Sequence, residues 1–175
     1  GVLTDKNRTT IVAYPAGKGK RYIIPDGITK IGTHSFFACP ITYIHTPNSV
    51  KTIELFAFAS CTDLDTIILG NSVDSIEGAA FRINDRLKTI YSMNPIPPAA
   101  HPEAFSSFSP MFFIQCTLYV PVGSLQAYKN AEVWKNFKNI VENDFTGIER
   151  PSPDKAKIFG NKNSISFRNI EPGTD

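Results

Sequence analysis

Apolar residues recur along the chain at intervals of 22 to 24 positions. Phenylalanine stands at positions 36, 58, 81 and 105, so successive members are 22, 23 and 24 residues apart. Further apolar columns follow the same period: Ile28, Val50 and Val73; Ile31, Ile53 and Ile76; Ile41, Leu64 and Leu87; Tyr22, Ile44, Ile67 and Ile90. A period of about 20 to 50 residues is the signature of solenoids and other arrays whose stacked units share one core. The pattern therefore predicts a repeat array.

Each repeat begins with a short extended segment, seen as YIIP at 22–25, YIHT at 43–46 and TIIL at 66–69. A turn rich in Gly, Asn or Pro follows each of them. Short strands with turn signals at this spacing predict the coils of a parallel β-solenoid. Because side chains alternate along a strand, Ile67 and Leu69 are expected to point inward, and Thr66 and Ile68 outward.

The outward positions of successive strands form two predicted rows: Arg21, Tyr43, Thr66, Thr89 and Thr117, and Ile23, His45, Ile68, Tyr91 and Tyr119. The second row is unusually apolar for a surface in contact with water. Aromatic and aliphatic side chains on such a face favour a binding surface. The alternative is that these apolar positions are incidental, or that the C-terminal cap or tail covers them.

Cys39, Cys61 and Asn84 share one column of the repeat, with Phe108 next in line. A small side chain that donates a hydrogen bond can satisfy backbone groups left unpaired inside a turn, so this column is predicted to be structural. A disulfide between Cys39 and Cys61 stays open, because neighbouring strands lie about 4.8 Å apart. The remaining alternative is metal binding. Cys116 stands outside the column and is expected in the core.

The end of the repeats carries the pattern of a terminal cap. Ser124 is a predicted N-cap of a short helix that buries Leu125 and Tyr128. Trp134, Phe137 and Ile140 continue its apolar face. A stack of coils needs such a cover at its open end. We therefore predict a repeat domain over residues 1–143, with a cap at its C-terminal end.

Beyond residue 143 the composition changes. The stretch GIERPSPDKAK at 147–157 has the proline, serine and charge content of a linker. The segment AKIFGNKNSISFRNI at 156–170 alternates apolar and polar residues around GNKN, which predicts a β-hairpin. The predicted organisation is a linker at 144–155 and a hairpin at 156–175 that could begin a truncated β domain.

Charge and composition exclude several classes of function. Lys and Arg number 18 against 16 for Asp and Glu, so no global charge favours nucleic acid or an anionic membrane. No apolar run approaches the roughly 18 residues of a membrane helix. Metal-binding spacings such as C-x-x-C are absent from the sequence, and no nucleophile motif accompanies the histidines. Asp63 and Asp65 are expected to be solvated. We predict no catalytic residue, no metal and no cofactor.

The motif I-x-x-x-A-F-x-x-C-x-x-L occurs as IELFAFASCTDL at 53–64 and as IEGAAFRINDRL at 76–87. With the N-terminal stretch at 9–32 and the C-terminal stretch at 117–142, it resembles the BspA-like leucine-rich-repeat family, of the Treponema pallidum repeat type. The C-terminal likeness lies on six positions: Leu118, Val120, Pro121, Tyr128, Trp134 and Phe137. The resemblance covers about residues 7 to 143.

This resemblance implies a right-handed, β-dominated solenoid of the α/β class. Short parallel strands would line its concave side, irregular or 3-10 turns its convex side, and a short helical cap its C-terminal end. It also implies a secreted or surface-exposed bacterial protein, especially of Bacteroidetes, in a family associated with adhesion and protein binding. A signal peptide is expected to have been removed before residue 1.

The expected function is non-enzymatic recognition of a protein or glycan through the two outward rows, by a monomer that does not insert into a membrane. The alternative is a structural spacer that presents other parts of a larger surface protein and has no ligand of its own.

Overall fold

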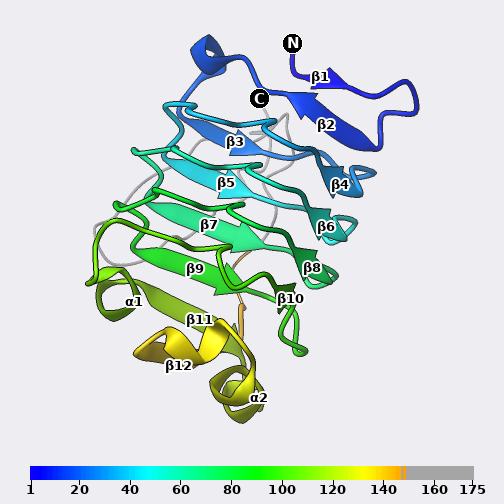
Figure 1. Ribbon diagram of the computed structural model, residues 1–175. Helices are drawn as coiled ribbons and strands as arrows, with labels where there is room; N and C mark the ends of the chain where they lie inside the picture. The colour runs from blue at the N-terminus through cyan, green and yellow to red at the C-terminus, as the bar shows by residue number, and fades with distance from the viewer. Residues whose placement is uncertain (147, 149–175) are drawn as a thin grey trace, which may run out of the picture. The chain divides into compact units, whose positions relative to one another are not determined.

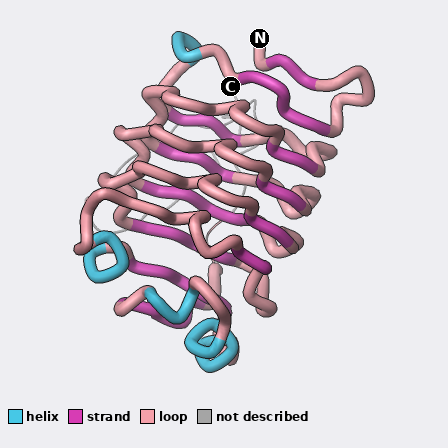
Figure 2. Tube along the Cα trace, viewed as in Figure 1, coloured by secondary structure: helices cyan, strands magenta, loops and turns pink. Residues whose placement is uncertain are grey.

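Two six-stranded sheets run along the stack of coils formed by residues Gly1–Asn143 (Figure 1). The structure is a computed structural model that describes residues 1–146 and 148. From Thr10 to Pro121 successive strands alternate between the two sheets, and turns join them (Figure 2). Residues from Asp144 onward belong to a second unit. The predicted hairpin at 156–175 and nearly all of the predicted linker at 144–155 lie outside the described residues.

We call the first sheet the long sheet. Its strand order is β12-β11-β9-β7-β5-β3, and every neighbouring pair is parallel. The strands are β3 (Arg21–Ile23), β5 (Tyr43–His45), β7 (Thr66–Leu69), β9 (Thr89–Ser92), β11 (Thr117–Pro121) and β12 (Asn139–Asn143).

The second, short sheet has the order β1-β2-β4-β6-β8-β10. Its strands are β1 (Leu3–Thr4), β2 (Thr10–Ala13), β4 (Lys30–Ile31), β6 (Thr52–Ile53), β8 (Ser75–Ile76) and β10 (Ala99–Ala100). The β1–β2 pair is antiparallel, and all other pairs are parallel. In the loop between β1 and β2, the Asp5 carboxylate accepts hydrogen bonds from the backbone N–H groups of Thr9 and Thr10 at 2.7 and 2.9 Å.

A stack of phenylalanine rings fills the space inside the coils. Phe36, Phe58, Phe81 and Phe105 are at most 1% exposed, and their ring centroids are 4.8, 5.3 and 5.1 Å apart along the stack. These distances are close to the spacing of about 4.8 Å between strands of a sheet. Each coil therefore places its ring directly on the ring of the coil before it.

A second internal column uses hydrogen bonds. Cys61 Sγ donates to Phe36 O at 2.9 Å, and Asn84 Nδ2 donates to Phe58 O at 2.9 Å, each one coil back. Cys39 Sγ contacts Tyr14 O in the same way at 3.6 Å. Cys39, Cys61 and Cys116 are buried free thiols; burial raises the pKa of Cys39, and it raises the pKa of Cys61 and Cys116 to about 12. All three thiols are therefore protonated near neutral pH.

Phe108, the expected next member of this column, does not continue it. Its side chain is 74% exposed. The backbone keeps the pairing of the earlier coils as far as Ser106, whose carbonyl accepts from Ile83 N at 2.9 Å, so the chain leaves the repeat geometry between Ser106 and Phe108.

The helical segments are few and short. They are the 3-10 turns η1 (Ala16–Lys18) and η2 (Trp134–Asn136) and the helices α1 (Phe112–Gln115) and α2 (Leu125–Asn130). No helix in the described part of the chain is long and apolar enough to cross a membrane.

The cap closes the stack as a set of aromatic contacts on its last ring. Trp134 and Phe137 meet Phe105 edge to face, with centroids 5.5 and 5.6 Å away. Tyr128 Oη donates to Asn94 O, and Trp134 Nε1 donates to Pro98 O, both at 2.7 Å. Ser124 is the N-cap residue of α2, but its side chain makes no capping hydrogen bond there. The prediction of a strand-dominated fold with short parallel strands is confirmed.

Replacing Phe58 with alanine should lower the free energy of unfolding by about 3 to 5 kcal/mol, because the ring leaves a cavity between two neighbours in the stack. Chemical denaturation measures this loss. Phe37→Ala is the matched control, since Phe37 is 49% exposed and its truncation should cost less than about 1 kcal/mol. Equal losses for the two variants would contradict the stacked core.

Replacing Asn84 with alanine should cost about 1 to 3 kcal/mol, because Phe58 O loses its donor inside the core. Asn84→Cys should cost less, since Cys61 performs the same role one coil earlier. Urea titrations of both variants separate these outcomes, and an Asn84→Cys variant no more stable than Asn84→Ala would refute the equivalence.

Candidate functional site

The outer face of the long sheet carries both predicted rows in register. Strand pairing aligns Arg21 with Tyr43, Tyr43 with Thr66, Thr66 with Thr89, and Thr89 with Thr117. The second row aligns in the same way, through Ile23, His45, Ile68, Tyr91 and Tyr119. We call this surface of ten side chains the long-sheet face.

The exposure of the long-sheet face differs from the expectation. Four of its ten side chains are buried: Tyr43 at 2%, His45 at 3%, Thr66 at 9% and Ile68 at 1% exposed. Arg21 is exposed, and the other five are half-buried. The Arg21 guanidinium lies 4.1 Å from the centroid of the Tyr43 ring. The centre of the face, on β5 and β7, is therefore shielded from water.

Two polar atoms in this shielded centre have no hydrogen-bond partner among the described residues. They are Tyr43 Oη and His45 Nδ1, both on β5. A buried polar group without a partner costs about 1 to 3 kcal/mol. Such groups are retained in native proteins for a reason, which a missing partner molecule can supply.

Burial also keeps both groups uncharged near neutral pH. Loss of hydration raises the pKa of Tyr43 to about 12, although the nearby Arg21 charge acts in the opposite direction. Loss of hydration lowers the pKa of His45 from 6.5 to about 4. The centre of the face therefore holds two neutral hydrogen-bonding groups, which a ligand can reach only where the side chains around them move aside.

An aromatic pair flanks this centre toward the C-terminal end of the sheet. The rings of Tyr91 and Tyr119 stack with centroids 4.8 Å apart, and both side chains are half-buried. Rigid aromatic groups of this kind are enriched among residues that dominate binding energy. The face thus combines apolar contact area with a small number of polar groups.

Ion pairs lie just before strands β7 and β9, at one edge of the face. Arg86 Nη1 lies 3.2 Å from Asp63 Oδ1, and Lys88 Nζ lies 3.5 Å from Asp65 Oδ1. Asp63 and Asp65 were expected to be merely solvated. Their pairing could have been found from the sequence, because each acid has a base 23 residues later, one repeat on.

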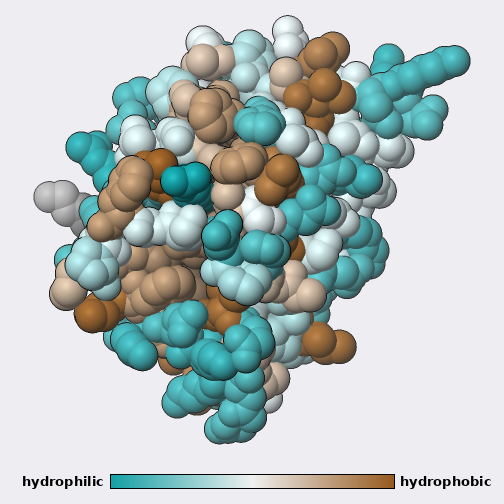
Figure 3. All heavy atoms as spheres, viewed as in Figure 1, coloured by the Kyte–Doolittle hydropathy of each residue, from teal (hydrophilic) through white to brown (hydrophobic). Residues whose placement is uncertain are grey.

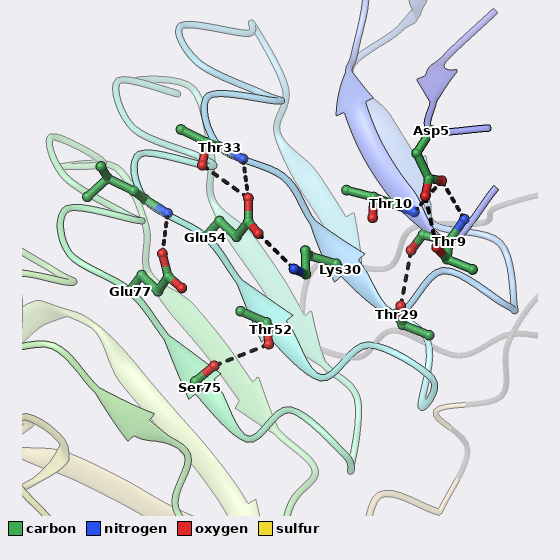
Figure 4. Close-up of polar contacts among 11 residues, drawn as sticks. Asp5, Thr9, Thr10, Thr29, Lys30, Thr33, Thr52, Glu54, Ser75 and Glu77 are labelled. Carbon is green, nitrogen blue, oxygen red and sulfur yellow. Dashed lines mark hydrogen bonds and ion pairs between the residues drawn. The ribbon is translucent and has the colours of Figure 1, made fainter. Parts of the chain in front are cut away.

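Sequence reasoning missed a ladder of carboxylates beside the short sheet. Glu54 Oε2 accepts hydrogen bonds from Thr33 N at 2.9 Å and Thr33 Oγ1 at 3.0 Å, and Glu54 Oε1 pairs with Lys30 Nζ at 3.1 Å (Figure 4). Glu77, one coil later, accepts from Leu55 N at 3.2 Å. The signal was present, because Glu54 and Glu77 occupy the same column of the repeat.

Exposed apolar side chains gather on a different part of the surface, around α1 (Figure 3). Phe108, Met111 and Ile114 are 74%, 43% and 45% exposed. Nothing in the described residues indicates what would cover them. Within the described part of the chain, no group of three or more His, Cys, Asp or Glu side chains could hold a metal ion.

Comparison with known proteins identifies the repeat. A family model described as the BspA type leucine rich repeat region matches residues 18–119, in six copies. No curated protein matches the chain.

Among solved structures, the pneumococcal vaccine antigen PcpA is 17% identical with a TM-score of 0.49, over 82% of this chain and 46% of that one. The chain thus spans less than half the length of that antigen. A leucine-rich repeat protein from Bacteroides capillosus is 25% identical with a TM-score of 0.48, over 63% of this chain and 85% of its own. The T. pallidum leucine-rich repeat protein is 18% identical with a TM-score of 0.48, over 81% and 78% respectively.

The shielded His45 should make the stability of the protein sensitive to acid. Its pKa is about 4 in the folded chain and 6.5 in the unfolded chain, so the unfolded chain takes up the proton first. Stability is therefore full above pH 6.5 and falls as the pH drops toward 4, by up to about 3 kcal/mol.

Denaturation curves at pH 7 and pH 4.5 test this expectation, with His45→Gln as the comparison. The variant should lose clearly less stability over that interval than the parent chain. Identical pH dependence of the two would show that His45 is not shielded in the folded protein.

Proposed function

The chain belongs to the BspA-type leucine-rich-repeat family, and we propose on that premise that its repeats form a non-enzymatic recognition module. Proteins with such repeats are generally protein-interaction modules. The proposed binding site is the long-sheet face, and the proposed setting is a secreted or cell-surface protein. Tyr43 Oη and His45 Nδ1 carry this proposal, because they are buried groups on that face with no hydrogen-bond partner among the described residues.

The chemistry of the face suits a protein ligand. The peptide backbone supplies neutral donors and acceptors, which match the uncharged Tyr43 hydroxyl and His45 imidazole. The stacked Tyr91 and Tyr119 rings would contribute apolar contact, while Arg21 at the opposite end of the rows provides a positive charge. A glycan would use the same hydroxyl and imidazole groups and is included in the test below.

A structural spacer is the second candidate function. The burial of Tyr43, His45, Thr66 and Ile68 favours it, because a covered face presents little surface to a partner. The two candidates differ in their prediction for the half-buried tyrosines. A recognition module needs these rings for binding, whereas a spacer needs them only for packing.

A Tyr91→Ser, Tyr119→Ser double variant should bind its ligand at least tenfold more weakly, because loss of aromatic anchors typically costs about 2 kcal/mol or more. Surface plasmon resonance against a panel of extracellular-matrix proteins and mucosal glycans measures this effect. Phe37→Ser is the matched control, since it removes an exposed aromatic ring from a turn outside the long sheet.

Binding by the parent chain that is lost in the double variant and kept in the control supports the recognition module. Binding lost only in the control would place the site elsewhere. A parent chain that binds no member of the panel would favour the spacer.

A further inference from the structure

A groove of about 680 Å³ lies beside β8 and β10, on the side of the molecule where the carboxylate ladder runs. Its apolar lining includes Leu55, Ile76 and Ala99, and its polar lining includes Glu77, His101 and Glu103. The groove does not involve the long-sheet face. Its position is where the next carboxylate of the ladder would be expected.

The ladder follows a simple rule in the earlier coils. After β6 and after β8, the next residue is a glutamate that reaches back and accepts the N–H of a turn residue in the preceding coil. Glu54 follows β6 and accepts from Thr33 N, and Glu77 follows β8 and accepts from Leu55 N, at 2.9 and 3.2 Å. The equivalent donor in the next coil is the N–H of Gly78, since residues 33, 55 and 78 each lie two positions after a paired isoleucine.

The rule breaks after β10, because His101 occupies the position of the glutamate. Its imidazole Nδ1 accepts the N–H of Glu103 at 3.2 Å and so turns to its own coil. Among the described residues, none accepts a hydrogen bond from Gly78 N. The ladder therefore ends with a donor and no carboxylate.

A second backbone N–H group, that of Ala79 beside Gly78, also lacks an acceptor among the described residues. In the earlier coils, His34 N donates to Leu55 O and Phe56 N donates to Gly78 O, at 3.2 and 3.3 Å. Ala79 stands at the equivalent position and shares their left-handed backbone, with φ of 54°. Its N–H has no acceptor within the described part of the chain, although the residue is only 4% exposed.

Consecutive backbone N–H groups in such a turn form a concavity that binds anions. We propose that the groove binds the carboxylate of an acidic side chain from a partner protein, which replaces the missing glutamate. Gly78 N and Ala79 N donate to it, and the apolar lining contacts the methylene groups of the same side chain. The chain's own use of Glu54 and Glu77 at the two preceding positions identifies a carboxylate as the group that this turn accepts.

Glu77 and Glu103 also line the groove, and their like charge opposes the incoming carboxylate. Glu77 is already held by the Leu55 N–H, and the imidazole of His101 lies beside Gly78 in the same groove. The opposing charge of Glu103 has a useful consequence. Neutralising Glu103 should strengthen binding, whereas it would have no such effect on a ligand that carries no charge.

Nuclear magnetic resonance of the ¹⁵N-labelled full chain tests the proposal directly. The probes are the peptides acetyl-Gly-Glu-Gly-amide and acetyl-Gly-Gln-Gly-amide, each titrated into the protein to millimolar concentration. We expect the amide signals of Gly78 and Ala79 to shift when the glutamate peptide is added. The glutamine peptide should bind at least about tenfold more weakly, because a charged acceptor makes the stronger hydrogen bond. Equal binding of the two peptides would overturn the proposal, as would unmoved Gly78 and Ala79 signals.

Three variants sharpen the test. His101→Glu restores the ladder residue and should abolish binding, because its own carboxylate then occupies the Gly78 donor. His101→Ala is the matched control, which removes the imidazole without supplying a carboxylate and should keep binding. Glu103→Gln should bind the glutamate peptide several-fold more tightly. Binding that survives in His101→Glu, or that weakens in Glu103→Gln, would contradict the proposed site.

Discussion

Every part of this structure depends on the contact between one coil and the next. A single coil cannot bury its apolar side chains, since both of its strands are short and its ring lies at its centre. Stacking pairs the strands and buries the rings at the same time, because neighbouring strands lie at a spacing that also suits stacked rings. The Phe36–Phe105 column and the hydrogen bonds of Cys61 and Asn84 are the two internal expressions of this constraint.

The same constraint arranges the surfaces. Because the coils are in register, each side chain lies directly beside the equivalent side chains of the neighbouring coils. Side chains of similar chemistry therefore form rows along the stack. The long-sheet face carries two such rows, and the glutamate ladder forms another beside the short sheet. Both of our proposals place recognition where a row departs from full pairing, either through unsatisfied groups, as at Tyr43 and His45, or through an interruption, as at His101.

Much of the fold follows from the sequence, because the repeat period and the alternation along strands are local patterns. They place Phe58 and Phe81 in the core and align Tyr43 with Thr66. The burial of His45 and Ile68 does not follow, since exposure depends on what packs around a strand and not on its alternation. Phe108 could not be placed because the chain leaves the repeat pattern only after Ser106, in a turn that the earlier coils do not share. Glu54 and Glu77 could be seen in the sequence as one column of the repeat. Their hydrogen bonds could not be predicted, because the sequence does not show that these side chains reach back to the preceding coil. The boundary near residue 143 and the use of the long-sheet face for binding remain predictions.

The central claim is that the partner supplies the missing hydrogen bonds at the centre of the long-sheet face. The ¹⁵N chemical shift of His45 Nδ1 tests it most directly, because imidazole nitrogen shifts report both protonation and hydrogen bonding. The account predicts a neutral ring whose Nδ1 signal shifts when the binding partner is added, while the signals of His34 stay in place. A His45 signal unchanged by a partner that binds the chain would contradict it.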